Sequence, residues 1–310
     1  MSAAAMLIAL AIDGALGWPD AAYRRIGHPV TWLGRLIDLL DRRWNRGTDR
    51  ARHRAGIAAA AAVIAAAVLP AMALAAILPG GVTGAVLTGV LAWPLVAARS
   101  LFTHLRAVAD PLAARDLPRA RAAVAMIVGR DPATLDAAGV ARAALESLAE
   151  NTSDGVVAPL FWGALFGLPG IAGYKAINTL DSMIGHRTPR HEAFGAASAR
   201  IDDLANWVPA RLTGMIFAAV SPRPRAALGA MARDARRHRS PNAGWPEAAM
   251  AGALGVRLSG PRIYGDRIAP EPWLNGAAPD PGRDTLARGL RLYLRAMLGV
   301  AAGLALWAAA

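Results

Sequence analysis

An uninterrupted apolar run from Gly56 to Leu78 limits what this chain can fold into more than any other feature. As a helix rising about 1.5 Å per residue, it is long enough to cross the roughly 30 Å hydrocarbon core of a bilayer. Pro79-Gly80-Gly81 follows as a tight turn, and the apolar chain returns over Val82–Ala98 with a bend expected at Pro94. Arginines flank both outer ends, so we expect a helical hairpin whose ends both face the cytoplasm.

Composition points the same way. Of the 310 residues, 55% are hydrophobic and 18% charged, which favours a polytopic membrane protein over a soluble domain. The net charge of +12 is carried almost wholly by arginine, which suits cytoplasmic loops beside anionic lipid or a polyanionic substrate. We do not expect nucleic acid as a partner, because no DNA- or RNA-binding motif is present. The chain has no cysteine, which excludes disulfides and thiolate chemistry.

The remaining segments complete an all-α prediction. Ser2–Leu16 resembles a short membrane helix with one buried acid, Asp13, and Arg99–Ala149 a helical cytoplasmic segment in which Asp131-Pro132 starts a helix. Prolines and glycines interrupt Gly155–Gly173, which predicts a broken or re-entrant membrane segment. We therefore expect one domain over residues 1–310, a polytopic integral membrane protein with broken or re-entrant helices and helical cytoplasmic segments. Plain loops are expected at Thr48–Arg54 and Ala269–Arg283.

The first polar cluster lies where a predicted helix meets apolar chain. Glu146 and Glu150 are four residues apart and share a helix face, and a polar stretch that includes Asn151, Ser153 and Asp154 follows. Acids at a membrane edge are costly and often functional. The alternative is a surface helix end with Glu146 paired to Arg142.

A second cluster follows the broken segment. Asn178 and Asp181 share a helix face, Gly185 fits a helix C-cap, and the pair His186-Arg187 lies just beyond. Lys175, the chain's one lysine, precedes them on the same predicted helix.

The third cluster contains Arg200, Asp202, Asp203 and Asn206 and precedes a short apolar run, Val208–Val220. Adjacent acids on a helix point about 100° apart, so we expect Asp202 and Asp203 to have different roles. A solvated helix start is the alternative.

Two further positions are candidates. His28 precedes Pro29, which suits either a site residue or a turn histidine, and Asn242 lies in a polar loop before Pro246. Pro246 is expected to open a helix with Glu247 in its first turn, where an acid can be purely structural.

In these stretches the chain resembles the CobD/CbiB family of cobalamin biosynthesis, the adenosylcobinamide-phosphate synthases. The matching stretches, in order, are Gly27-His28-Pro29, the segment 127–131, ESLAENTSDGVVAPLFWGALFGLPG from Glu146, YKAINTLDSMIGHR from Tyr174, FGAASARIDDLANWVPARLTG from Phe194 and RSPNAGWPEAAMAGALG from Arg239. The resemblance implies a multi-pass inner-membrane enzyme that joins (R)-1-amino-2-propanol, or its O-phosphate, to a propionate carboxylate of adenosylcobyric acid. It also implies that ATP is consumed and that an amide forms.

The residues allow several assignments for that chemistry. No phosphate-binding loop or protein-kinase motif is present, so the nucleotide site is expected to be unconventional. Magnesium prefers oxygen ligands, and its candidate ligands are Glu146, Glu150, Asp154 and Asp181. Lys175, Arg187 and Arg200 are candidates for holding phosphate. Asp202, Asp203, His28 or His186 can act as the base. Asn151, Ser153, Asn178, Asn206 and Asn242 are candidate substrate or nucleotide contacts.

Sidedness and alternative functions remain open on the residues alone. We expect that neither Gly155–Gly173 nor Val208–Val220 crosses the bilayer fully, so that the three clusters share one cytoplasm-facing pocket. A transporter with a mid-membrane site and a membrane scaffold for corrinoid-pathway enzymes are the alternatives.

Overall fold

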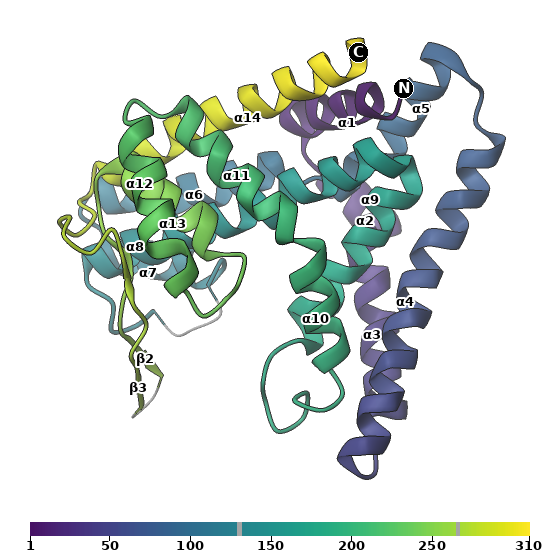
Figure 1. Ribbon diagram of the computed structural model, residues 1–310, viewed down its shortest axis with the longest axis horizontal. Helices are drawn as coiled ribbons and strands as arrows, with labels where there is room; N and C mark the ends of the chain where they lie inside the picture. Colours follow the sequence, from purple (N-terminus) through teal and green to yellow (C-terminus); the bar gives the residue numbers. More distant parts are fainter. Residues whose placement is uncertain (129–131, 265–266) are drawn as a thin grey trace. The chain divides into compact units, whose positions relative to one another are not determined.

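The computed structural model describes residues 1–128, 132–264 and 267–310, which fold mostly as helices (Figure 1). The all-α expectation is confirmed, and the strands of the described part lie between residues 258 and 274. The chain divides into two compact units, one of residues 1–97, 158–206 and 303–310, the other of residues 98–157 and 207–302. The single domain expected over 1–310 remains a prediction.

The first unit is arranged around one long helix, α9 (Ala158–Ile184). Helices α1, α3, α4, α5 and α10 all pack against it. The core between α3, α4 and α9 contains fully buried Ile37, Val63 and Leu180. The helices of this unit besides α9 are α1 (Ser2–Leu16), α2 (Asp20–Ile26), α3 (Pro29–Trp44), α4 (Asp49–Ile77), α5 (Gly81–Ala92), the 3-10 turn η1 (Trp93–Leu95) and α10 (Ala196–Ala205).

The two helices of the expected hairpin are present, and the bend at Pro94 is the 3-10 turn η1. However, α4 and α5 pack mainly on other helices rather than on each other. Helix α4 lies along α9, α3 and α10, whereas α5 lies along α1 and α9. The small residues glycine and alanine on α5 explain why it packs on α1, because Ile8 of α1 fits directly against Gly89.

The predicted break in the apolar chain after Gly155 is also present. Helix α9 contains one non-helical residue, Gly167, with φ 66° and ψ −149°. Residues with a side chain rarely adopt this conformation, and Pro169 follows two residues later. The chain N-terminal to α9 forms a π-helical turn, η2 (Ser153–Val157).

The second unit surrounds α13 (Gly244–Leu254), which is buried almost all round and packs on α8, α11 and α12. The helix begins at Gly244, two residues before Pro246, which was expected to open it, and Glu247 lies in the first turn, as expected. The core includes fully buried Leu145, Phe217 and Met250. The other helices of this unit are α6 (Ala98–Ala113), α7 (Leu117–Ala125), α8 (Ala137–Thr152), α11 (Trp207–Val220), α12 (Pro224–Asp234), the 3-10 turn η3 (Ala235–Arg237) and α14 (Thr285–Ala309), whose last residues belong to the first unit.

Two antiparallel strand pairs complete this unit. Strand β1 (Leu258–Ser259) pairs with β4 (Trp273–Leu274), with Ser259 opposite Trp273. Strand β2 (Arg262–Tyr264) pairs with β3 (Arg267–Ala269) and forms the hairpin labelled in Figure 1.

Three local expectations were wrong. Thr48–Arg54 is not a loop, because Thr48 caps α4 and the helix begins at Asp49. Ala269–Arg283 is not a plain loop, because it contains β4. Helix α8 begins after Asp136, whose carboxylate accepts a hydrogen bond from Gly139 N–H at 2.7 Å, and not at Pro132. Asp131, the expected cap, lies outside the described residues.

Four helical stretches of the described chain are long and apolar enough to cross a membrane: Asp49–Ile77, Gly81–Ala113, Ala137–Ile184 and Thr285–Ala309. A fifth candidate is α1 together with the segment Asp20–Trp44, bent by 108°. Asp13 of α1 is buried, as expected. Several apolar residues of α4 and α5 are exposed on the isolated chain, among them Leu69, Met72 and Val82, which is the pattern of a lipid-facing surface.

Candidate functional site

In the first unit, four predicted residues form one charged group at the C-terminal end of α9. Asp181 lies in the last turn of α9, and Gly185 ends that helix by donating its N–H to the Asp181 carbonyl at 2.8 Å. The charge of Asp181 interacts with those of His186 and Asp203, and Asp203 interacts with Arg187. Two acids and two bases from α9, α10 and the turn between them are therefore neighbours, and we name them the α9–α10 charged group.

Asp203 is exposed on α10, yet its pKa differs from that of a free carboxylate. Desolvation raises the pKa of Asp203 above its usual value, and the positive charge of Arg187 opposes that rise. A carboxylate with a raised pKa is a better proton acceptor, because its basicity is closer to the operating pH.

The adjacent acid, Asp202, is buried in a chain of hydrogen bonds. Tyr174 Oη donates to Asn206 Oδ1 at 2.8 Å, and Asn206 Nδ2 donates to Asp202 Oδ2 at 3.0 Å. All three side chains are less than a tenth exposed. This chain ties α10 to α9, which supports the expectation that Asp202 and Asp203 have different roles. We had not singled out Tyr174, although it opens one of the polar stretches.

His28 has a local structural task. It is the N-cap of α3, and its Nδ1 accepts a hydrogen bond from Val30 N–H at 3.2 Å. The ring packs edge-on against Trp18, with centroids 5.3 Å apart, and lies within electrostatic range of Lys175. A capping nitrogen is less available as a base, so the turn-histidine interpretation is the better supported one.

The other candidates of this unit lie on α9 and α10. Asn178 is half-buried one turn before Asp181, and Lys175 is half-buried one turn before Asn178. The spacing of three places them on neighbouring positions of one helix side. Arg200 is exposed on α10.

The turn that carries His186 and Arg187 is fastened to α3 and α4 by residues that sequence reasoning missed. Asp41 is buried and accepts hydrogen bonds from Arg190 Nε at 2.8 Å and Asn45 Nδ2 at 2.7 Å. On α4, a side chain at Gly56 would lie 1.9 Å from the Phe194 carbonyl oxygen. These contacts hold the middle and the C-terminal end of the turn, and no short sequence motif marks them.

In the second unit, Glu146 is a buried anchor. Its Oε1 accepts a hydrogen bond from the backbone N–H of Ser259 in β1 at 2.7 Å. Ser259 has a positive φ of 59°, so the carboxylate holds an unusual backbone conformation. The alternative pairing with Arg142 does not describe the structure, because Arg142 is bonded to Asp280.

The polar residues that follow Glu146 are partly satisfied within their own helix. Asn151 Nδ2 donates to the Ser147 carbonyl at 2.8 Å, and Ser147 Oγ donates to the Ile127 carbonyl at 2.8 Å. Ser153 is buried at the start of η2, and its hydroxyl has no hydrogen-bond partner among the described residues. Glu150 is exposed and Asp154 half-buried.

Asn242 is bound to an arginine that the sequence analysis did not select. Arg211 Nη1 approaches Asn242 Oδ1 at 3.3 Å. The Arg211 guanidinium lies between two indole rings, 4.4 Å from the centroid of Trp207 and 4.5 Å from that of Trp245. Arginine between aromatic faces is well held, so Asn242 belongs to a fixed polar corner of this unit.

The described residues contain no group of three or more histidines and acids arranged to hold a metal ion. Magnesium typically needs only one or two protein carboxylates, with water and phosphate as its other ligands. Asp181, in the last turn of α9, can supply one such carboxylate, whereas Glu146 already uses one oxygen to anchor β1. The metal assignments of Glu146, Glu150 and Asp154 remain predictions.

Comparisons with known proteins agree over nearly the whole chain. Residues 6–293 match the family described as "CobD/Cbib protein". The chain is 66% identical over 298 residues to "Cobalamin biosynthesis protein CobD" of Rhodobacter capsulatus, covering 96% of this chain and 95% of the relative. Proteins of the same name from Sinorhizobium fredii (47% identical, 88% of this chain and 86% of the relative) and Brucella suis (46%, 86% and 85%) are also similar. A comparison with solved structures found no match.

Proposed function

Because the chain belongs to the CobD/CbiB family, we propose that it is a membrane enzyme of cobalamin biosynthesis that forms an amide bond. The acyl substrate is a propionate carboxylate of adenosylcobyric acid. The amine is (R)-1-amino-2-propanol or its O-phosphate, and ATP is the energy source. The name shared by the relatives and the length of the match support the pathway, and the α9–α10 charged group supports the reaction type.

The reaction balances through an acyl phosphate. The carboxylate oxygen attacks the terminal phosphorus of ATP, ADP leaves, and an acyl phosphate forms. The amine nitrogen then attacks the acyl carbon, phosphate leaves, and the nitrogen loses one proton. Catalysis requires that the reacting groups be positioned, that negative charge be neutralised and that a base accept the proton.

The charged group and the residues near it on α9 and α10 are suited to these tasks. Asp203, with its raised pKa, is the base for the amine proton. Arg187 and Lys175 neutralise phosphate charge. Asp202, through Asn206 and Tyr174, positions α10 and therefore Asp203.

Magnesium would be held by Asp181, with water and phosphate as its other ligands, and would supply charge neutralisation at the transferring phosphate. Asp181 is placed for this by Gly185, which fixes the last turn of α9. His186 lies beside Asp181 and contributes positive charge there when it is protonated.

The single observation that carries the proposal is that Asp181, His186, Arg187 and Asp203, which come from two sequence clusters, interact at one helix end. The test is an assay of the purified full-length chain in lipid nanodiscs with magnesium, ATP, corrinoid acid and either amine. Amide product and ADP should appear together, in equal amounts, and only when all components are present. Corrinoid or amine uptake into sealed vesicles without any amide product would instead favour a transporter. Neither product nor uptake would favour a scaffold.

We also propose that this site faces the cytoplasm of a bacterial inner membrane, as the arginine-rich loops favour. The chain has no cysteine of its own, so a single one at exposed Glu192 can report the side of the turn. Glu192→Cys should react with a membrane-impermeant thiol reagent only after cell lysis. Reaction in intact cells, at the level of a known periplasmic control, would place the turn outside.

A further inference from the structure

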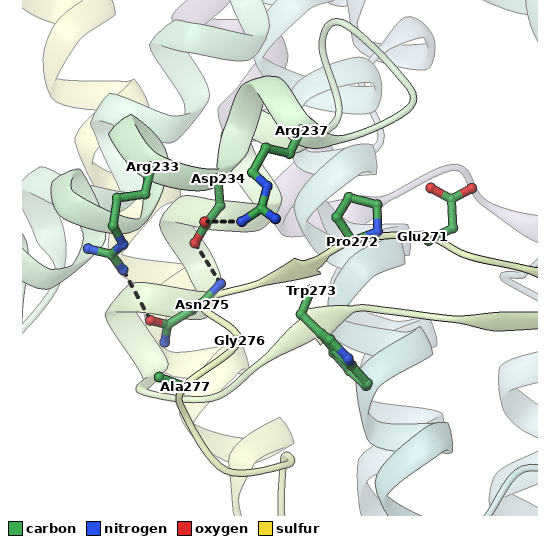
Figure 2. Close-up of a pocket in the computed structure, with 9 residues that line it drawn as sticks. All are labelled: Arg233, Asp234, Arg237, Glu271, Pro272, Trp273, Asn275, Gly276 and Ala277. Atoms are coloured by element: carbon green, nitrogen blue, oxygen red, sulfur yellow. Dashed lines mark hydrogen bonds and ion pairs between the residues drawn. The ribbon is translucent and has the colours of Figure 1, made fainter.

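A cavity in the second unit supports a separate inference. It has a volume of about 530 Å³ and lies between the end of α12 with η3 and the segment that contains β4 (Figure 2). Arg233 and Arg237 line one side, and Trp273 and Asn275 line the other. Pockets of this size take small molecules.

The lining of the cavity contains two arginines and two carboxylates, and Arg239, which lies beside the lining, adds one further positive charge. Of its two carboxylates, buried Asp234 lies 3.7 Å from Arg237, and Glu271 lies 3.7 Å from Arg239. Arg233 has a weaker attachment, a contact of 3.5 Å between its Nη2 and Asn275 Oδ1. Each acid is therefore offset by its own arginine, and the exposed guanidinium of Arg233 accounts for the net positive charge. Figure 2 shows Arg233, Asp234 and Arg237 along one side of the site.

The wall opposite the arginines is held in place. Asn275 has a positive φ of 56°; its N–H donates to Asp234 Oδ2 at 2.8 Å, and its Nδ2 donates to the Val256 carbonyl at 3.1 Å. Buried Asp234 thus fixes the loop that presents Asn275. A binding wall fixed before the ligand arrives lowers the entropy cost of binding.

Trp273 is fixed by a second set of contacts. Its ring lies between the guanidinium groups of Arg142 and Arg257, 4.7 and 4.3 Å from the centroid, and both arginines bind Asp280. On the backbone side, Trp273 pairs with Ser259, whose N–H is bonded to Glu146. The acid of the first polar cluster therefore positions this wall.

We propose that this cavity binds the phosphate group of a small phosphorylated molecule. Arginine forms paired hydrogen bonds with phosphate oxygens, and the fixed amide of Asn275 can contact the organic part of the molecule. The source of the phosphate is a phosphorylated amino alcohol or a nucleotide. The identity of these two candidate ligands rests on the proposed function. The existence of a phosphate-binding site in this cavity does not.

The test is calorimetric titration of the purified full-length chain with three probes: 1-amino-2-propanol O-phosphate, ATP and unphosphorylated 1-amino-2-propanol. Arg233→Gln removes the weakly attached guanidinium and should leave the fold intact, since the residue is exposed. Arg225→Gln is the matched control, because Arg225 is exposed on the same helix about 12 Å away by helical rise.

Arg233→Gln should weaken binding of one phosphorylated probe by about tenfold or more, the value of a lost charge-assisted hydrogen bond. Binding of the unphosphorylated amine and the behaviour of Arg225→Gln should be unchanged. The probe that is weakened identifies the source. Equal weakening in both variants, or unchanged binding of both phosphorylated probes in Arg233→Gln, would overturn the site. Binding that depends on Arg233 in a chain that forms no amide would refute the proposed function and leave the site standing.

Discussion

The α9–α10 charged group and Glu146 offer a direct comparison, because both place carboxylates at or near the end of a long helix. Asp181 and Asp203 lie beside His186 and Arg187, and their charges interact at the rim of the first unit. Glu146 is buried in the second unit and bonded to a backbone N–H of a strand. The first arrangement leaves charge that a substrate can use, whereas the second uses charge to hold the fold.

The comparison teaches that spacing alone does not separate a reactive acid from a structural one. Glu146 and Glu150 share a helix face, as do Asp202 and Asn206. Glu146 is nevertheless bonded to a strand, and Asp202 and Asn206 are both buried and bonded to each other. What distinguishes the acids is the group from which each accepts a hydrogen bond. A backbone N–H or a buried amide indicates positioning, and neighbouring charged side chains indicate chemistry.

The largest effect is expected from Asp181→Asn, which removes one charge from the α9–α10 charged group. Amide formation should fall by about 100-fold or more, as is common when a group that stabilises transferring charge is lost. Asp38→Asn is the control, since Asp38 forms an exposed ion pair with Arg42 on α3 of the same unit. Turnover assays on both folded variants check the prediction, and equal turnover in the two would contradict it.

Glu146 should affect stability instead. Glu146→Ala leaves the Ser259 N–H buried without its acceptor and should destabilise the protein by about 1–3 kcal/mol. Glu146→Gln keeps an oxygen in place and should be much milder. Thermal unfolding of the two variants measures the difference. Identical unfolding temperatures, both equal to wild type, would show that Glu146 does not anchor β1.

Arg187→Gln should move the pH profile of turnover without abolishing activity at high pH. Arg187 lowers the pKa of Asp203 against the effect of desolvation, so its loss raises that pKa further. Asp203 then becomes protonated at a higher pH, and the acid limb of the profile shifts upward. Arg42→Gln, a change on α3, should leave the limb in place. A shift in the opposite direction would contradict the assignment of Asp203 as base.

The smallest effect is expected at Asp280, in the wall of the second unit. Hydrogen bonding to Arg257, with the charge of Arg142, lowers the pKa of Asp280 below its usual value. A depressed carboxyl pKa stabilises the fold above the unfolded value of about 4, and that stabilisation is lost as the pH falls through the folded pKa. Asp280→Asn should lose no more than about 1 kcal/mol near neutral pH, because the group is partly exposed.

Unfolding temperatures near pH 7 and below pH 4 test this, with Asp284→Asn as the control, since the Asp284 side chain is mostly exposed beside Arg288. The loss caused by Asp280→Asn should shrink at the lower pH. A loss that is the same at both values would mean that Asp280 acts without its charge.

The amino-acid sequence alone predicted most of the helices and the residues of the α9–α10 charged group. Apolar length predicts α4, Gly185 predicts the end of α9, and Gly167 with Pro169 accounts for the predicted break. His186 and Arg187 come five and six residues after Asp181, so their nearness to it is local in the sequence.

The remaining features depend on contacts between distant segments. Nothing near Glu146 in the sequence indicates that Ser259 will donate to it, and nothing near Asp41 indicates Arg190. Trp273 was assigned to a plain loop because a two-residue strand has no periodicity to detect. These pairings follow from packing, which a single sequence pattern does not encode.

The central claim is that Asp203 acts in the reaction whereas Glu146 holds the fold. The most direct test measures ATP-dependent amide formation by Asp203→Asn and Glu146→Gln in the same nanodisc preparation, normalised to folded protein. Asp203→Asn should lower the rate of amide formation by about 100-fold or more. Glu146→Gln should lower that rate by less than about tenfold, because its side-chain oxygen still accepts a hydrogen bond from Ser259 N–H. The reverse order, with Glu146→Gln inactive and Asp203→Asn active, would contradict the central claim.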